Sequence, residues 1–102
     1  MNIGDLMKQA QQFQENLVSV QNDLANKQVT GSAGAGMVTV TLNGKGELLD
    51  LVIEQALVQP ENTQMLQDLV VAAVNDGLVK ARELGKAEMT RLTGGLNIPG
   101  LL

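Results

Sequence analysis

The feature that most constrains the fold is a heptad pattern of apolar residues near the start of the chain. Apolar side chains recur there at alternating steps of three and four: Ile3, Leu6, Ala10, Phe13, Leu17, Val20 and Leu24. This spacing puts them on one stripe of an α-helix, called the seam below, and a seam of three heptads packs lengthwise against another helix. The sequence therefore predicts a helix from Ile3 to about residue 26, capped by Asn2, with a helical partner.

The middle of the chain predicts a small antiparallel sheet. Positions 37–43 alternate, with Val38, Val40 and Leu42 on one face, which is typical of a half-buried strand. Asn43-Gly44 is a strong hairpin signal and leads into a return strand over 47–54. We expect that return strand to place Leu49, Leu51 and Ile53 on one face and Leu48 and Val52 on the other.

Two segments flank this hairpin. Before it, the sequence predicts a short extended segment over residues 27–30 and a flexible connection between strands over the glycine-rich run 31–36. After it, a second helix begins near Asn62 or Thr63, either of which can cap it, and runs to about Leu92 before two glycines. The order is α-β-β-β-α, an α+β fold with one domain over residues 1–93 and a flexible tail over 94–102.

Apolar residues on both sides of the return strand bear on assembly. An antiparallel sheet with one solvated face does not need Leu48 and Val52, although single apolar residues are common on surfaces. Together with the seam, they favour a second face buried in a homodimer. The second helix is apolar almost all round in its first half, as expected inside an assembly. The predicted dimerisation residues are Leu48, Val52, Leu69, Val70 and Ala73.

The chain offers little catalytic or metal-binding chemistry. It contains no cysteine and no histidine, so thiolate and imidazole metal sites are excluded. Asp68 and Asp76 are too few for a hard cation and read as solvated surface. Gly31, Gly34 and Gly36 precede a strand, whereas a phosphate loop needs a helix after it. We therefore expect neither an enzyme nor a metal, a cofactor or a small-molecule substrate.

The same sequence indicates where the protein resides. An Asp and a glutamine-rich run occupy the place of a signal peptide's apolar region. The longest apolar run, residues 69–74, is far too short for a membrane span. We expect a cytoplasmic protein that does not enter a membrane.

Charge is distributed unevenly along the 102 residues. The net charge is −4, yet residues 80–102 carry four cations against Glu83 and Glu88. The candidate phosphate-binding residues are these cations and a polar group on the first helix: Lys80, Arg82, Lys86 and Arg91 with Lys8, Gln9 and Gln12. Charged residues on a helix are usually only solvated, so the pattern alone leaves both interpretations open.

Three segments of the chain resemble the YbaB/EbfC family, small bacterial nucleoid-associated DNA-binding proteins. They are Leu6-Met-Lys-Gln-Ala-Gln-Gln12, the run from Val29 through Gly36 into Val38-Thr-Val-Thr-Leu-Asn-Gly44, and Met65-Leu-Gln-Asp-Leu-Val70 followed by Ala72-Ala73 and Asn75-Asp76. The motifs stand in the family's order and spacing from Asp5 to about Leu92.

The resemblance implies a tweezer-like homodimer with paired sheets at its base and helical arms that bind duplex DNA, chiefly through phosphates. It implies a location in the nucleoid and roles in nucleoid organisation and gene regulation. Carried onto this chain, the arm positions are Lys8, Lys80, Arg82 and Lys86, with Arg91 beyond the matching part. The first helix has fewer cations than many members, which leaves an alternative: a dimeric protein-interaction module with little or no DNA binding.

Overall fold

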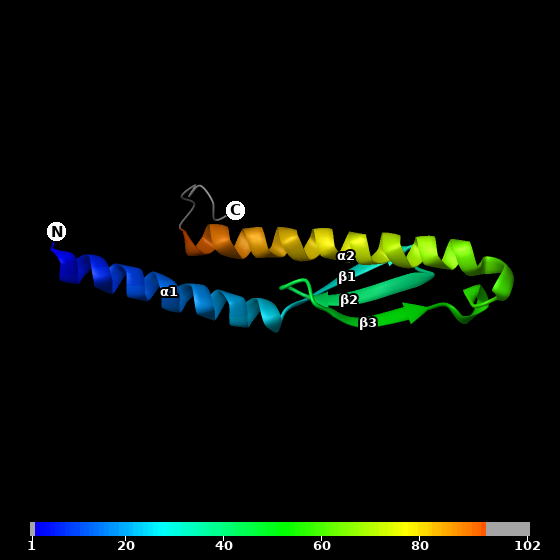
Figure 1. The fold of residues 1–102 in the computed structure, drawn as a ribbon, viewed down its shortest axis with the longest axis horizontal. Coiled ribbons are helices and arrows are strands. Elements are labelled where there is room, and N and C mark those ends of the chain that lie inside the picture. The colour runs from blue at the N-terminus through cyan, green and yellow to red at the C-terminus, as the bar shows by residue number, and fades with distance from the viewer. Residues whose placement is uncertain (1, 94–102) are drawn as a thin grey trace.

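The computed structural model describes residues 2–93, and the predicted tail at 94–102 lies outside them. The chain forms a three-stranded antiparallel sheet that one long helix covers, and a second long helix that projects away from the sheet, confirming the α-β-β-β-α order and the α+β class (Figure 1). The elements are α1 (Ile3–Ala25), β1 (Gln28–Ala33), β2 (Val38–Asn43), β3 (Leu48–Ile53), two short 3₁₀ helices η1 (Gln55–Leu57) and η2 (Pro60–Asn62), and α2 (Thr63–Leu92).

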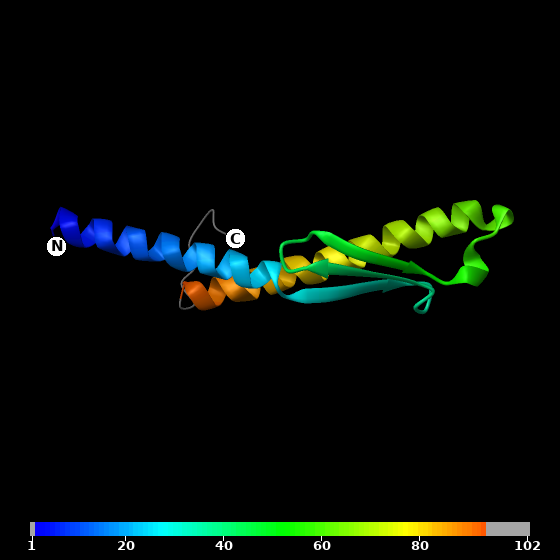
Figure 2. The same cartoon turned by 90° about the horizontal axis from the view of Figure 1, so that it is seen from below.

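The molecule is strongly elongated. Its extents are 69 × 22 × 16 Å and its radius of gyration is 19.0 Å, against about 13 Å for a compact domain of similar length. The first half of α2 covers the sheet, and its second half runs beside α1 (Figures 1 and 2). We call α1 together with residues 78–92 of α2 the arm.

The seam of α1 is only partly covered. Leu24 is buried and Leu17 and Val20 are half-buried, whereas Ile3 and Leu6 are 74% and 52% exposed. The reason is that α1 extends well past the last turn of α2 (Figure 1). The predicted cap is confirmed, because Asn2 Oδ1 accepts a hydrogen bond from the Asp5 backbone N–H at 2.8 Å. Neither helix, within the part described, is long and apolar enough to cross a membrane.

The core lies between β2 and α2. Val38, Val40 and Leu42 of β2 are almost completely buried, as their alternation predicted. Asn43 closes the β2–β3 turn, since its Oδ1 accepts from the backbone N–H groups of Lys45 and Glu47, each at 3.0 Å. The β-branched strand and the hairpin therefore form where the local sequence places them.

A close contact between β1 and α2 corrects the expectation for residues 31–36. Gly31, Ser32 and Ala33 belong to β1 and pair with β2, so only the residues that follow form the connection. A Cβ on Gly31 would collide with the backbone of Ala73 and Gly77, and a Cβ on Gly77 would collide with Leu42. The glycines here serve packing, because they let a strand lie directly against a helix backbone.

β3 departs from the predicted alternation. A register shift at Thr41/Leu42 places Leu48 opposite Leu42, and directly paired residues share one face. Leu48 is therefore on the core-facing side of the sheet with Leu51, and its expected position on the opposite face is wrong.

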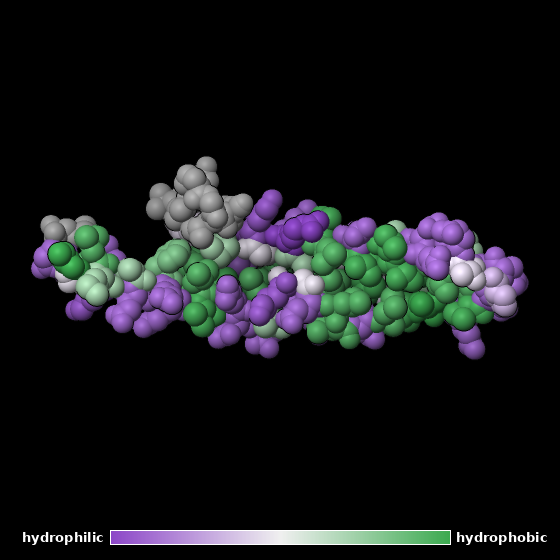
Figure 3. Space-filling model, viewed as in Figure 1, coloured by the Kyte–Doolittle hydropathy of each residue, from purple (hydrophilic) through white to green (hydrophobic). Residues whose placement is uncertain are grey.

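β3 is nevertheless poorly covered. Because α2 lies over β1 and β2, four of the five apolar residues of β3 remain 40–55% exposed: Leu48, Leu49, Leu51 and Val52. Figure 3 shows a broad hydrophobic surface over the sheet half of the molecule.

The start of α2 uses no side-chain cap, contrary to our expectation. Asn62 Nδ2 donates to the Leu57 carbonyl at 3.4 Å, and Thr63 Oγ1 donates to the Pro60 carbonyl at 2.8 Å. Both polar side chains donate to carbonyls of η1 and η2, the short helices that precede α2, so neither caps α2. The helix nevertheless begins and ends close to the predicted residues.

The glycine contact generates a stability prediction. Gly77→Ala should lower the free energy of unfolding by about 1–3 kcal/mol, because the new methyl group overpacks the core against Leu42. Gly85→Ala is the matched control in the same helix: its Cβ meets nothing within 4 Å, and it should raise stability by about 0.5–1 kcal/mol. Urea denaturation measures both, and equal effects of the two substitutions would contradict the packing argument.

Candidate nucleic-acid interface

The structure divides the cations of the chain into two groups. Three of them bind carboxylates: Lys27 and Arg91 contact Glu88, and Lys80 contacts Asp76. The other four make no ion pair with any residue from 2 to 93: Lys8, Lys45, Arg82 and Lys86. The predicted DNA-binding cations thus include two that are paired with carboxylates, Lys80 and Arg91, and three that have no ion pair within residues 2–93, namely Lys8, Arg82 and Lys86.

Glu88 is a buried carboxylate at the base of the arm. Its side chain is 5% exposed, Lys27 Nζ lies 2.5 Å from Oε1, and Arg91 Nη2 lies 2.8 Å from Oε2. The hydrogen bond from Lys27, followed by the nearby charge of Arg91, holds the pKa of Glu88 below its ordinary value against the opposing effect of burial. Because Lys27 follows α1 directly, this pair fastens the end of α1 to α2.

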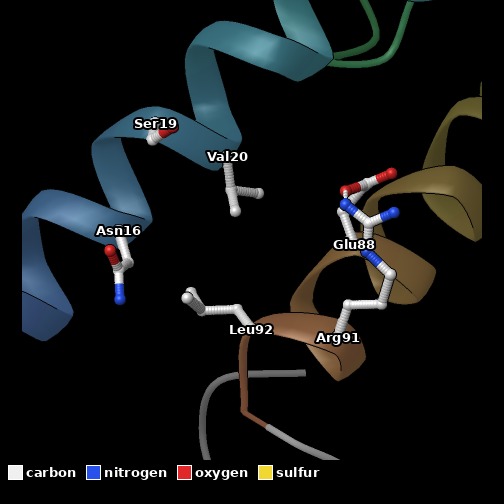
Figure 4. Close-up of a pocket in the computed structure, with 6 residues that line it drawn as sticks. All are labelled: Asn16, Ser19, Val20, Glu88, Arg91 and Leu92. Atoms are coloured by element: carbon white, nitrogen blue, oxygen red, sulfur yellow. Dashed lines mark hydrogen bonds and ion pairs between the residues drawn. The ribbon is translucent and has the colours of Figure 1, made fainter.

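Arg91 borders a polar hollow between the two helices of the arm (Figure 4). Asn16, Ser19 and Val20 contribute from α1, and Glu88, Arg91 and Leu92 from α2. Val20 and Leu92 extend into the space between the helices, while Arg91 lies beside Glu88 (Figure 4). The guanidinium is exposed but already has a carboxylate partner, so its positive charge is partly neutralised.

Lys80 and Asp76 bind the outer edge of β1. Asp76 Oδ2 accepts a hydrogen bond from the Ser32 N–H at 3.0 Å, and Lys80 Nζ donates to the Thr30 carbonyl at 3.0 Å and to Asp76 at 3.2 Å. The Ser32 N–H, and then Lys80, lower the pKa of Asp76. The prediction that Asp76 is merely solvated is therefore wrong: it and Lys80 satisfy backbone groups that β2 leaves unpaired.

Arg82 and Lys86 lie on an exposed face of α2. Both border a hollow whose α1 side is formed by Val20, Gln21 and Leu24. Arg82 also borders an adjoining hollow with Lys45 of the β2–β3 turn. Sequence reasoning did not select Lys45, because nothing in its local sequence shows that this turn folds against α2.

The predicted residues of α1 form a separate group. Lys8, Gln9 and Gln12 are exposed, on the part of α1 that projects beyond α2. The last turn of α2 lies beside Asn16 and Ser19, so Lys8 is about 12 Å further along the helix at 1.5 Å per residue. One DNA duplex must therefore follow the arm lengthwise to contact both groups.

The predicted dimerisation residues differ in how exposed they are. Leu48 and Val52 are about half exposed, whereas Leu69 and Val70 pack against the core of their own chain. Ala73 is completely buried, beneath Gly31, so its side chain cannot reach a partner.

Across residues 2–93, no three acidic side chains come together as a metal site would require.

Comparison with known proteins identifies close relatives. The model of the YbaB/EbfC DNA-binding family matches residues 1–96. A nucleoid-associated protein of Desulfotalea psychrophila is 54% identical, covering 99% of this chain and 95% of its own. One from Clostridium novyi is 50% identical, covering 99% and 89%. An uncharacterized Helicobacter pylori protein, HP0035, has a similar crystal structure, with a TM-score of 0.83, 28% identity and coverage of 92% and 99%.

The buried carboxylate generates a pH prediction. The pKa of Glu88 is lower in the folded chain than in the unfolded one. Its pairing therefore stabilises the fold fully above the unfolded value, near 4.5, and this stabilisation is lost as pH falls through the folded pKa. Glu88→Gln should lower the melting temperature at neutral pH, and the difference from wild type should shrink in acid.

Thermal denaturation over a pH series measures this difference. Glu83→Gln removes an exposed carboxylate of the same helix, with no ion pair to a residue of the described chain, and controls for the loss of charge alone. A gap between wild type and Glu88→Gln that stays constant with pH would contradict the role given to the ion pairs.

Proposed function

The chain belongs to the YbaB/EbfC DNA-binding family, and we propose that it is a nucleoid-associated protein whose homodimer binds duplex DNA along its helical arms. The observation that carries the proposal is the match of the family model over residues 1–96. The family is not enzymatic, in agreement with the prediction that the chain is no enzyme. The protein would then be located in the cytoplasmic nucleoid and would act in nucleoid organisation and gene regulation.

The exposed cations and glutamines of the arm support binding through DNA phosphates. Arg82, Lys86 and Lys8 are exposed and make no ion pair with a residue of the described chain. Gln9 and Gln12 beside Lys8 can add hydrogen bonds to phosphate or sugar oxygens. Lys80 and Arg91 contribute less, because Asp76 pairs with Lys80 and Glu88 partly neutralises Arg91. Contacts to phosphates carry no sequence information directly, so we expect sequence preference to be weak.

A homodimer would account for the poorly covered strand β3. β1 has its outer edge bound by Asp76 and Lys80, whereas β3 is an edge strand with exposed apolar residues. On α2, Val71 and Val79 are 60% and 44% exposed. A second copy seated against β3 and the neighbouring face of α2 would bury this apolar surface and place two arms on one assembly.

The acidic net charge of the protein limits the affinity. Two chains of −4 carry −8, so only the local charge of the arms attracts phosphate, and added salt screens it within about 10 Å at 0.1 M. We therefore expect modest affinity that falls steeply with salt concentration.

The DNA-binding proposal predicts a contrast between free and paired cations. Arg82→Gln with Lys86→Gln removes four free charges from a dimer, so the slope of log affinity against log salt should fall by about 3.6. Lys80→Gln removes a cation that Asp76 already binds, and it should change the slope much less. Fluorescence anisotropy with a duplex at several salt concentrations measures both.

Absence of binding by the wild-type dimer even at low salt would overturn the proposal. That result would favour the alternative, a dimeric protein-interaction module.

The dimer proposal predicts a mass of twice 10.8 kDa in solution. Val52→Asp or Leu48→Asp should shift the protein toward monomer, because a carboxylate buried against a partner's apolar surface loses its hydration. Val58→Asp changes an equally exposed valine that lies outside the sheet, at 57% exposure, and should leave the mass unchanged. Light scattering measures all three, and a monomeric wild type would refute the assembly.

A further inference from the structure

We propose that Lys45, Arg82 and Lys86 surround a seat for one DNA backbone phosphate over Gly85, at the base of the arm. This site rests on the proposed DNA binding and gives it a location. It adds Lys45 of the β2–β3 turn and Gly85 of the arm to the interface, neither of which was among the predicted DNA-binding residues. Its ligand is a phosphodiester group, which three cations can contact without reading a base.

The first observation is the convergence of three cations on adjoining hollows. Lys45 and Arg82 border one of them, and Arg82 and Lys86 border the other. Gly85 lies in the lining of both hollows. None of the three cations has an ion pair within residues 2–93, in contrast to Lys27, Lys80 and Arg91. The charge at this place is therefore available to a ligand.

The like charges of these exposed cations repel one another weakly when no anion is bound. Arg82 and Lys86 are four residues apart on α2, a spacing at which like charges lie side by side and repel. Lys45, brought in by the β2–β3 turn, adds a third positive charge to the same side. A phosphate group between them would replace this repulsion with attraction and charge-assisted hydrogen bonds.

The second observation is that nothing in the fold requires glycine at position 85. A Cβ there would meet no atom within 4 Å, whereas at Gly31 and Gly77 it would collide with neighbouring elements. Glycine destabilises a helix interior relative to alanine, so its presence is not explained by packing. It leaves open space beside the cations, which lets a phosphate approach the helix backbone closely.

The decisive variant is Gly85→Ala, because its two expected effects have opposite signs. It should raise the melting temperature, since alanine favours the helix and has room. It should also weaken binding to duplex DNA by at least about threefold, because the methyl group holds phosphate oxygens away from the cations. A purely structural role for Gly85 predicts the first effect without the second.

Lys45→Gln tests the cation that the turn contributes. It should weaken binding and lower the slope of log affinity against log salt by about two, because a dimer loses two phosphate contacts. Gln59→Glu is the control for net charge: it makes the same change of one unit per chain at an exposed loop position beyond the far end of the sheet. It should leave the slope unchanged.

The outcomes separate this site from the proposed function. If the wild-type dimer binds DNA while Gly85→Ala and Lys45→Gln bind as tightly as wild type, the seat is refuted and the DNA-binding function stands. If the wild type itself fails to bind at low salt, both are refuted. If Lys45→Gln and Gln59→Glu weaken binding equally, the effect is one of overall charge and the seat is again refuted.

Discussion

The fold depends on the direct contact between β1 and α2. Gly31 and Gly77 meet there without side chains, and Leu42 of β2 fills the space beside them. With almost no aromatic residues, the chain builds its core from aliphatic side chains, which pack well only when backbones approach closely. This approach also brings Asp76 and Lys80 within hydrogen-bonding distance of β1. The position of the helix over one side of the sheet is thus set by two residues that lack a side chain.

That position determines what the rest of the surface can do. Because α2 lies over β1 and β2, β3 keeps its apolar residues exposed. At the other end of the helix, Glu88 fastens α1 beside α2 through Lys27, which sets the direction of the arm. The cations that serve these structural contacts are paired with Glu88 or Asp76, whereas the other four have no ion pair within residues 2–93. Packing therefore selects which charges stay available.

The sequence predicted what depends on local periodicity. The seam, the alternation of β2 and the Asn43-Gly44 turn gave the helices and the hairpin close to their observed bounds. It could not predict that Gly31 continues a strand, because the reason is contact with Gly77, far along the chain. The register shift that moves Leu48, the burial of Glu88 and the use of Lys80 at the edge of β1 likewise depend on tertiary contacts. For the same reason the sequence predicted the candidate site only as a set of cations and glutamines, without the ion pairs that distinguish Lys80 and Arg91 from Arg82 and Lys86.

The two edge strands of the sheet, β1 and β3, differ in how readily they can pair with a strand of another chain. A strand edge with free backbone groups can add another strand, and a sheet with two such edges can extend without limit into fibres. Here Asp76 and Lys80 of α2 bind the Ser32 N–H and the Thr30 carbonyl of β1, so β1 is less able than β3 to accept a neighbouring strand. In the proposed homodimer, two chains joined at β3 would expose only their β1 edges, where Asp76 and Lys80 disfavour further strand pairing. In that assembly Lys80 and Asp76 would limit further growth of the sheet, and Lys80 would be less available to bind a phosphate.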